Sequence, residues 1–133
     1  MTGPRARRHV RHGYRGLQVL TILAVFFGVT SGHAAGDEAR GMQLYLSRCT
    51  GCHSIDANRI GPSHAGVFGR VAGKFQGYDY SAALKASRLK WTEMNLDRWL
   101  KDPQKLVAGQ KMGYAVPDAT DRADLIAYLR TVR

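Results

Sequence analysis

The chain has 133 residues, with 20 lysines and arginines against 10 aspartates and glutamates, which gives a formal net charge of +10. This length predicts a single domain. Five arginines and no acidic residue lie in the first 16 positions, so the rest of the chain carries a net charge of +5. That moderate excess suits a soluble protein that meets acidic partners. It excludes a dedicated nucleic-acid binder, which would gather its basic residues on one face or helix.

Residues 1–35 follow the order of a secretory signal peptide. A basic start is followed by the apolar run Leu17–Val29 and by the small residues of TSGHAAG. We expect cleavage after Ala34 or Ala35, which leaves residues 36–133 as the mature domain. An arginine pair near the start has no apolar run directly behind it, so the general secretory route is expected. The apolar run is shorter than the roughly 20 residues of a spanning helix, and an uncleaved anchor is the alternative.

The mature domain is expected to be all α. Helical periodicity and end signals predict helices at about 37–48, 81–87, 93–101 and 121–131. Thr92 can cap the third of these helices, and Pro103 follows its end. Long glycine-rich loops join the helices, and no strand-like alternation occurs. Short helices around long loops make a small core, so a large bound apolar group is expected to add substantially to it.

Cys49 and Cys52 are the only cysteines of the chain, and His53 follows them directly. A disulfide between them would constrain the unfolded chain very little, and structural zinc needs four ligands. A redox dithiol of the thioredoxin kind needs a βαβ setting, which the pattern lacks. C-x-x-C-H is the attachment signature of c-type haem, in which the thiols bind the porphyrin and the histidine binds the iron. Covalent haem is therefore the preferred interpretation, with a redox dithiol as the alternative.

The second axial position on the iron decides between electron transfer and an open, reactive site. Met42 and Met94 lie on predicted helices, where packing explains them, and His64 is expected to be an exposed residue of a glycine-rich loop. Met112 lies instead in a loop between two glycines, which let the backbone approach the porphyrin closely. It follows His53 by 59 positions, enough chain to pass around the porphyrin. Met112 is therefore the preferred second iron ligand.

Six motifs resemble, in the same order, those of the class I cytochromes c, the kind shared by mitochondria and bacterial periplasms: CTGCH, GPSHAGVFGR, GYDYSAALK, WTEMNLDRWLKDP, KMGYA and DLIAYL. The resemblance runs from about Gly41 to Leu129. It implies a small all-α fold, with about four helices and glycine-rich loops wrapped around one covalent haem c. The residues that would hold this haem are Cys49 and Cys52, as thioethers, and His53 and Met112, as axial ligands of the iron.

The resemblance also implies roles for residues around the haem. The Pro62 carbonyl would accept the ring N–H of His53, and Trp99 would lie beside the ligand methionine. A haem propionate, which would be costly to bury alone, would be contacted or neutralised by Arg70, Tyr80 and Trp91. Further matching positions are Tyr114 at the haem edge, and Gly41, Tyr45, Leu125 and Tyr128 where the first and last helices cross.

The chain departs from the family at several positions. Ala108 stands where many members have a proline before the ligand methionine, and Leu84 replaces a polar amide near the haem. Pro117 and Asp118 stand where mitochondrial members have lysines, so part of the basic docking ring is missing. The basic residues that remain as docking candidates are Arg48, Lys74, Lys101, Lys105 and Lys111.

The function that the resemblance implies is one-electron transfer by a soluble, periplasmic, monomeric carrier that is not an enzyme. Its expected partners are a quinol-oxidising cytochrome complex on one side and an oxidase, reaction centre or dehydrogenase on the other. No nucleic acid is expected to bind, and no stable membrane insertion is expected after cleavage. Two alternatives are a haem subunit or sensor fixed to a larger protein, and a peroxidase-like protein with a labile Met112, which Ala108 motivates.

Overall fold

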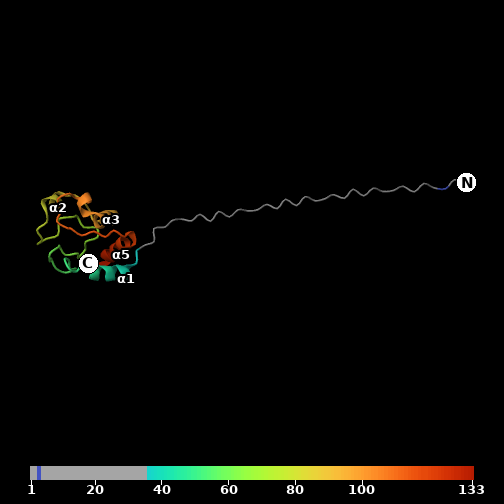
Figure 1. Ribbon diagram of the computed structural model, residues 1–133, viewed down its shortest axis with the longest axis horizontal. Helices are drawn as coiled ribbons and strands as arrows, with labels where there is room; N and C mark the ends of the chain where they lie inside the picture. The colour runs from blue at the N-terminus through green and yellow to red at the C-terminus, as the bar shows by residue number, and fades with distance from the viewer. Residues whose placement is uncertain (1–2, 4–35) are drawn as a thin grey trace. The chain divides into compact units, whose positions relative to one another are not determined.

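The computed structural model describes Gly3 and residues 36–133, so the predicted signal peptide and its cleavage site lie outside the described residues. The domain contains helices only, and the described residues form no strand beyond one isolated bridge between Val71 and Lys90. The helices are α1 (Glu38–Arg48), α2 (Ala82–Ala86), α3 (Glu93–Lys101), α4 (Pro103–Leu106) and α5 (Ala119–Thr131), and long loops follow α1 and α4 (Figure 1). The expected all-α class is confirmed.

None of the helices in the described part of the chain is both long and apolar enough to cross a membrane.

Local capping explains where the helices begin. Each helix follows a side chain that accepts a backbone N–H of its first turn, which satisfies a donor that has no partner inside the helix. These capping residues are Asp37, Ser81, Thr92, Asp102 and Asp118. Because Asp118 is a cap, α5 begins at Ala119 and not at about Asp121, as the sequence pattern predicts.

Helix α4 is an element that the sequence pattern did not predict. Pro103 ends the stretch expected to be helical, but it also occupies the first turn of α4, where a missing N–H costs nothing. Asp102 ends α3 and at the same time caps α4 through Lys105 N, at 3.0 Å. The two helices therefore follow one another with a single residue between them.

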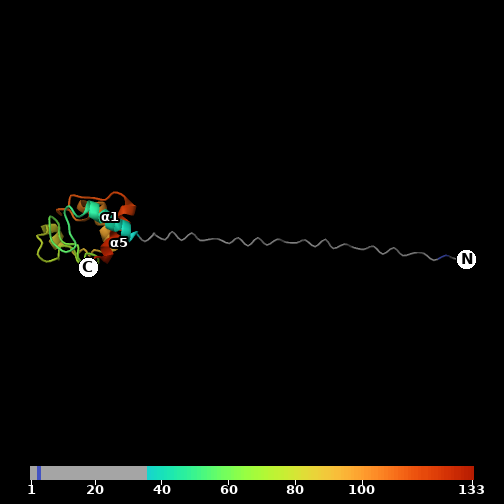
Figure 2. The ribbon, with the colours of Figure 1, turned by 90° about the horizontal axis from the view of Figure 1, so that it is seen from below.

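Helices α1 and α5 cross closely, side by side in both views of the ribbon (Figures 1 and 2). A Cβ atom on Gly41 would lie 1.9 Å from the carbonyl oxygen of Asp124, so only glycine fits at this crossing. Next to it, the rings of Tyr45 and Tyr128 lie 5.3 Å apart, and Leu125 is fully buried. The crossing predicted from these residues is confirmed.

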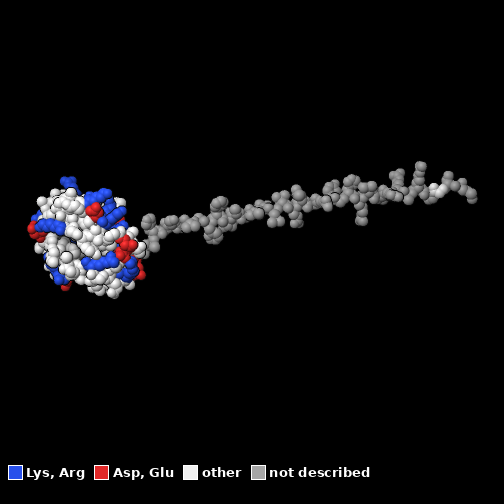
Figure 3. Space-filling view, viewed as in Figure 1, with Lys and Arg blue, Asp and Glu red and all other residues white. Residues whose placement is uncertain are grey.

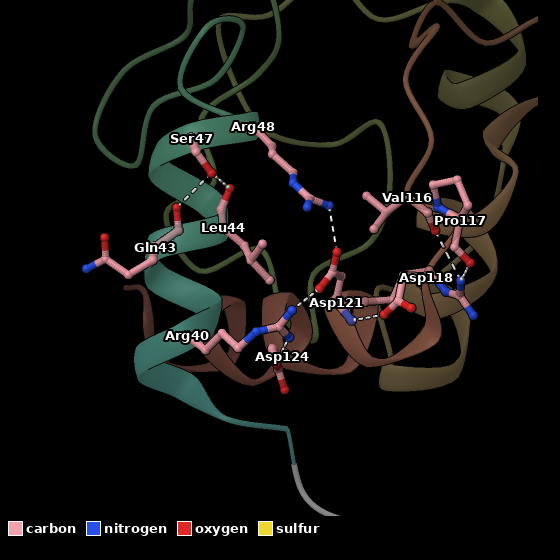
Figure 4. A network of polar contacts seen from close by, with 11 residues as sticks. Arg40, Gln43, Leu44, Ser47, Arg48, Val116, Pro117, Asp118, Asp121 and Asp124 are labelled. Atoms are coloured by element: carbon pink, nitrogen blue, oxygen red, sulfur yellow. Dashed lines mark hydrogen bonds and ion pairs between the residues drawn. The ribbon is translucent and has the colours of Figure 1, made fainter.

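Charged side chains reinforce the crossing (Figure 4). Arg40 on α1 donates to both Asp121 and Asp124 on α5, and Arg48 donates to the second oxygen of Asp121 at 2.8 Å. Both carboxylates are buried, and the hydrogen bond from Arg40 is the main reason that the pKa of Asp121 lies below its usual range. Because Arg48 directly precedes Cys49, this network holds the C-terminal end of α1 against α5.

Candidate functional site

A cavity of about 570 Å³ lies inside the domain, within the range of cofactor pockets. Its walls are mainly apolar side chains from α2, α3, α5 and the connecting loops, among them Leu84, Leu96 and Leu100. Every residue that the sequence assigns to a haem site lies on this cavity: Cys49, Cys52, His53, Pro62, Arg70, Tyr80, Trp91, Trp99 and Met112. The fold thus brings these residues together, while their roles toward a haem stay predictions.

The two cysteines lie where α1 ends. Cys49 is the C-cap of α1, and its carbonyl accepts hydrogen bonds from Cys52 N at 3.0 Å and from His53 N at 2.8 Å. Through this extra turn, Cys49, Cys52 and His53 all line one cavity. The two thiols form no disulfide. Burial raises the pKa of the Cys49 thiol to about 11. A raised pKa makes the Cys49 thiol a poor redox nucleophile, which argues against a dithiol oxidoreductase that attacks through Cys49.

The His53 ring is held on two sides. Its Nδ1 donates to the Pro62 carbonyl at 2.8 Å, which leaves Nε2 as the ring nitrogen available to a metal. Burial lowers the pKa of His53, while the Pro62 bond opposes that effect, and the neutral form that binds metals is favoured. A Cβ atom on Gly61 would lie 2.2 Å from Cε1 of His53, so the ring occupies the space that a side chain at Gly61 would need.

His64 corrects an expectation from the sequence. It is not an exposed loop residue, because its ring stacks on His53 with centroids 4.1 Å apart and planes inclined by 19°. The hydrogen bond from His64 N to the carbonyl of Ser54, at 2.9 Å, brings the loop back to the residue that follows His53. Burial lowers the pKa of His64 to about 3, so the ring is neutral at physiological pH. Its Nδ1 and the hydroxyl of neighbouring Tyr45 are buried, and neither has a hydrogen-bond partner within the described residues.

Met112 lies on the loop between α4 and α5, and its side chain reaches the cavity. The buried indole of Trp99 donates its Nε1–H to the Met112 sulfur at 3.2 Å, and the Trp91 ring packs edge-on against Trp99 at 5.1 Å. The structure thus places Trp99 beside the methionine, as expected. Sequence reasoning missed Gln110, whose side chain hydrogen-bonds the Met112 backbone. A long amide two positions before the methionine was the available signal.

Arg70, Tyr80 and Trp91 also line the cavity. The Arg70 guanidinium donates to the carbonyls of Ala65, at 2.6 Å, and Ser63, at 3.0 Å, and lies 4.4 Å from the centre of the Phe75 ring. Tyr80 and Trp91 are buried. These bonds fix a positive charge beside an apolar cavity, an arrangement that suits an anionic group on a large apolar ligand.

The rim of the cavity combines charge with exposed apolar surface. Arg48 and Lys111 line the cavity, while the side chains of Ile60 and Tyr114, also on its wall, are 75 % and 43 % exposed. Lys111 donates to the backbone carbonyl of Asp79 at 3.2 Å, so the Met112 loop is tied to the segment that contains Tyr78 and Tyr80. The three other basic docking candidates, Lys74, Lys101 and Lys105, do not line the cavity. On the face that Figure 3 shows, basic and acidic side chains are interspersed.

Comparisons with known proteins agree with this geometry. The family model described as Cytochrome c matches residues 38–133. Cytochrome c2 of Rhodopila globiformis is 44 % identical over 101 residues, which covers 74 % of this chain and 95 % of the relative. Cytochrome c 2.1 of Caenorhabditis briggsae is 43 % identical over 98 residues, or 71 % of this chain and 88 % of the relative.

A solved structure, cytochrome cH from Methylobacterium extorquens, is similar with a TM-score of 0.69 and 42 % identity, and covers 72 % of this chain and 99 % of its own. Together with the family model, it confirms the resemblance and the fold predicted from the motifs.

Proposed function

The chain belongs to the cytochrome c family, and from that premise we propose that it is a soluble periplasmic electron carrier that cycles one haem between the ferric and ferrous states. The family binds a single covalent haem c and carries electrons, and the matched relatives bear the names of cytochromes, which are not enzymes. Haem c supplies the one-electron chemistry. For this chain, we propose which residues hold the haem, which class of protein donates the electron and which class accepts it.

Cys49 and Cys52 would form the two thioethers to the haem. His53 Nε2 would bind the iron on one face of the haem, and the Met112 sulfur would bind it on the other face. The observation that carries this proposal is that the C-x-x-C-H turn and a methionine 59 positions later line one apolar cavity. Burial favours the neutral, metal-binding form of His53 by lowering its pKa, and the Pro62 carbonyl orients the ring. A thioether is a soft, neutral ligand that favours ferrous iron, so a high reduction potential is expected.

Two measurements on protein exported by a host able to attach haem test this assignment. Mass spectrometry of the intact protein should give the mass of residues 36–133, or of a product one residue longer, plus one haem. The ferric spectrum at neutral pH should contain the methionine–iron charge-transfer band. Free thiols that react with an alkylating reagent, or a ferric spectrum without the band in fully loaded protein, would contradict the assignment.

Export to the periplasm is supported by the signal-peptide pattern of residues 1–35. The proposed electron donor is a quinol-oxidising cytochrome complex, and the proposed acceptor is an oxidase, reaction centre or dehydrogenase.

Arg48 and Lys111 on the cavity rim would steer acidic patches of these partners toward the haem edge, with Ile60 and Tyr114 in apolar contact. The rate of reduction by membranes that contain such a complex should therefore fall as salt is added. A rate that is independent of salt would contradict this docking surface.

The contacts of Met112 argue against the peroxidase-like alternative. Trp99 bonds the sulfur at 3.2 Å and Gln110 bonds the ligand backbone at 2.7 Å, so the loop is restrained although Ala108 replaces a proline. A restrained ligand keeps the iron closed to peroxide, which favours the carrier.

A further inference from the structure

We propose that Gln110 is a positioning residue that keeps Met112 in place on the iron by bracketing the backbone of the ligand with its side-chain amide. The inference rests on the proposed function, because it takes Met112 as an iron ligand. Gln110 itself would not touch the iron. Its action would be to raise the barrier that the ligand loop must cross before the sulfur can leave.

The bracket consists of two hydrogen bonds from one side chain to one residue. Nε2 of Gln110 donates to the Met112 carbonyl at 2.7 Å, and Oε1 of Gln110 accepts from the Met112 N–H. A third bond, from Nε2 to Oε1 of Gln104 at 3.2 Å, ties the amide to α4. The amide thus uses both of its N–H donors and its acceptor in one place, which fixes its orientation.

Within the described residues, no backbone group forms a hydrogen bond with the backbone of Met112. Among the described residues, backbone–backbone hydrogen bonds of this segment stop at Gln110 N to Val107 O, at 3.2 Å, and resume at Val116 N to Leu100 O, at 2.7 Å. Gly109 has a φ of 84°, so the chain reverses just before the bracket, in a conformation that glycine tolerates. Since the backbone polar groups of Met112 find no backbone partner, the Gln110 amide takes the place of a strand neighbour.

The bracket and the Trp99 bond act on different parts of the ligand. Trp99 Nε1–H donates to the sulfur, whereas Gln110 holds the N–H and the carbonyl of the same residue. The sulfur can leave the iron by rotation of the side chain or by movement of the loop. Trp99 opposes the first movement and Gln110 opposes the second, so removal of the Gln110 amide should accelerate ligand release even with Trp99 in place.

The test uses the ferric, haem-loaded protein and two variants. Gln110→Leu removes the amide and all three hydrogen bonds without adding an iron ligand, while Gln110→Glu keeps the acceptor for Met112 N and loses the donor to Met112 O. The matched control is Gln43→Leu on α1, because no hydrogen bond involves the Gln43 side chain in the described structure and Figure 4 shows it pointing away from α5. Thermal unfolding of each variant, followed by far-UV circular dichroism, separates a general loss of stability from a local effect.

The readout is the rate at which imidazole replaces the methionine at saturating imidazole, where release of the sulfur limits the exchange. The loss of the two hydrogen bonds to Met112 predicts an increase of about tenfold or more in Gln110→Leu, a smaller increase in Gln110→Glu, and no change in Gln43→Leu. A rate in Gln110→Leu within about twofold of the parent, or an equal acceleration in Gln43→Leu, would overturn the inference. If the parent lacks the charge-transfer band, Met112 is not the ligand, and both the inference and the proposed ligand set are wrong.

Discussion

His53 and Met112 are supported in different ways, although both reach the same cavity. The supports of His53 come from nearby in the sequence: the Pro62 carbonyl, the close backbone of Gly61 and the stacked ring of His64. Met112 depends on Trp99 from α3 and on Gln110, which is itself tied to α4. The first proposed ligand, His53, lies in a short stretch that supports itself next to a helix end. The second proposed ligand, Met112, is carried by a loop that other elements must hold, so we expect the site to open on this side.

The sharpest test of this difference removes each ligand in turn. Met112→Ala is expected to retain covalent haem and the His53 bond, and to lower the reduction potential by roughly a few tenths of a volt, because the soft ligand is lost. His53→Ala is expected to reduce the yield of haem-loaded protein severely, because the histidine adjoins both thiols. Haem absorbance and potentiometric titration measure the two effects. Equal yields of haem-loaded protein for the two variants would contradict this difference between the two sides.

The next test adds one methyl group on each side of the cavity. Gly61→Ala places a Cβ atom 2.2 Å from the His53 ring, and overpacking of this kind is expected to destabilise the protein by about 1–3 kcal/mol. Gly113→Ala, next to Met112, is the matched control, because its Cβ atom meets nothing within 4 Å. The free energy of unfolding in urea is the measurement. A similar cost for both substitutions would show that the His53 side is no more tightly packed than the Met112 side.

A substitution at His64 is expected to have a smaller effect, and to stabilise the protein instead of destabilising it. Its Nδ1 is buried without a hydrogen-bond partner in the described structure, which costs free energy that an apolar side chain would not. His64→Leu, which also removes the ring stacked on His53, is expected to raise the free energy of unfolding by about 1 kcal/mol. Denaturant titration of the haem-loaded protein checks the sign. A loss of stability would mean that stacking on His53 outweighs the cost of the unpaired nitrogen.

The smallest expected effect on stability concerns the ion pairs that hold the C-terminal end of α1, the end next to Cys49, against α5. The pKa of Asp121 is lowered, first by the Arg40 hydrogen bond and also by Arg48, so its contribution to stability is present above the ordinary carboxyl pKa. That contribution is lost as the pH falls through the lower, folded-state pKa. Asp121→Asn should therefore be less stable at neutral pH and should lose less stability on acidification. Urea unfolding at a series of acidic pH values measures this, and parallel pH profiles would contradict it.

Much of the site could be predicted because its signals are local. C-x-x-C-H places its thiols and imidazole on one turn, and that turn continues from the end of α1. Met112 was predicted as a ligand by elimination, since Met42 and Met94 lie on helices. His64 was misread because a glycine-rich loop looks exposed in sequence, and Gln110 was overlooked because its partners are the backbone of Met112 and a side chain of the unpredicted helix α4.

By itself, the sequence predicted the helical class, the attachment turn and a set of candidate ligand residues, because helical periodicity, turn spacing and the chemistry of thiol, imidazole and thioether act over a few neighbouring positions. Only the tertiary structure decided that His64 lies under His53, that the Gln110 amide meets Met112, and that Arg48 pairs with Asp121. Burial and hydrogen-bond partners arise when distant segments pack together, and no local pattern records which segment will cover a given side chain.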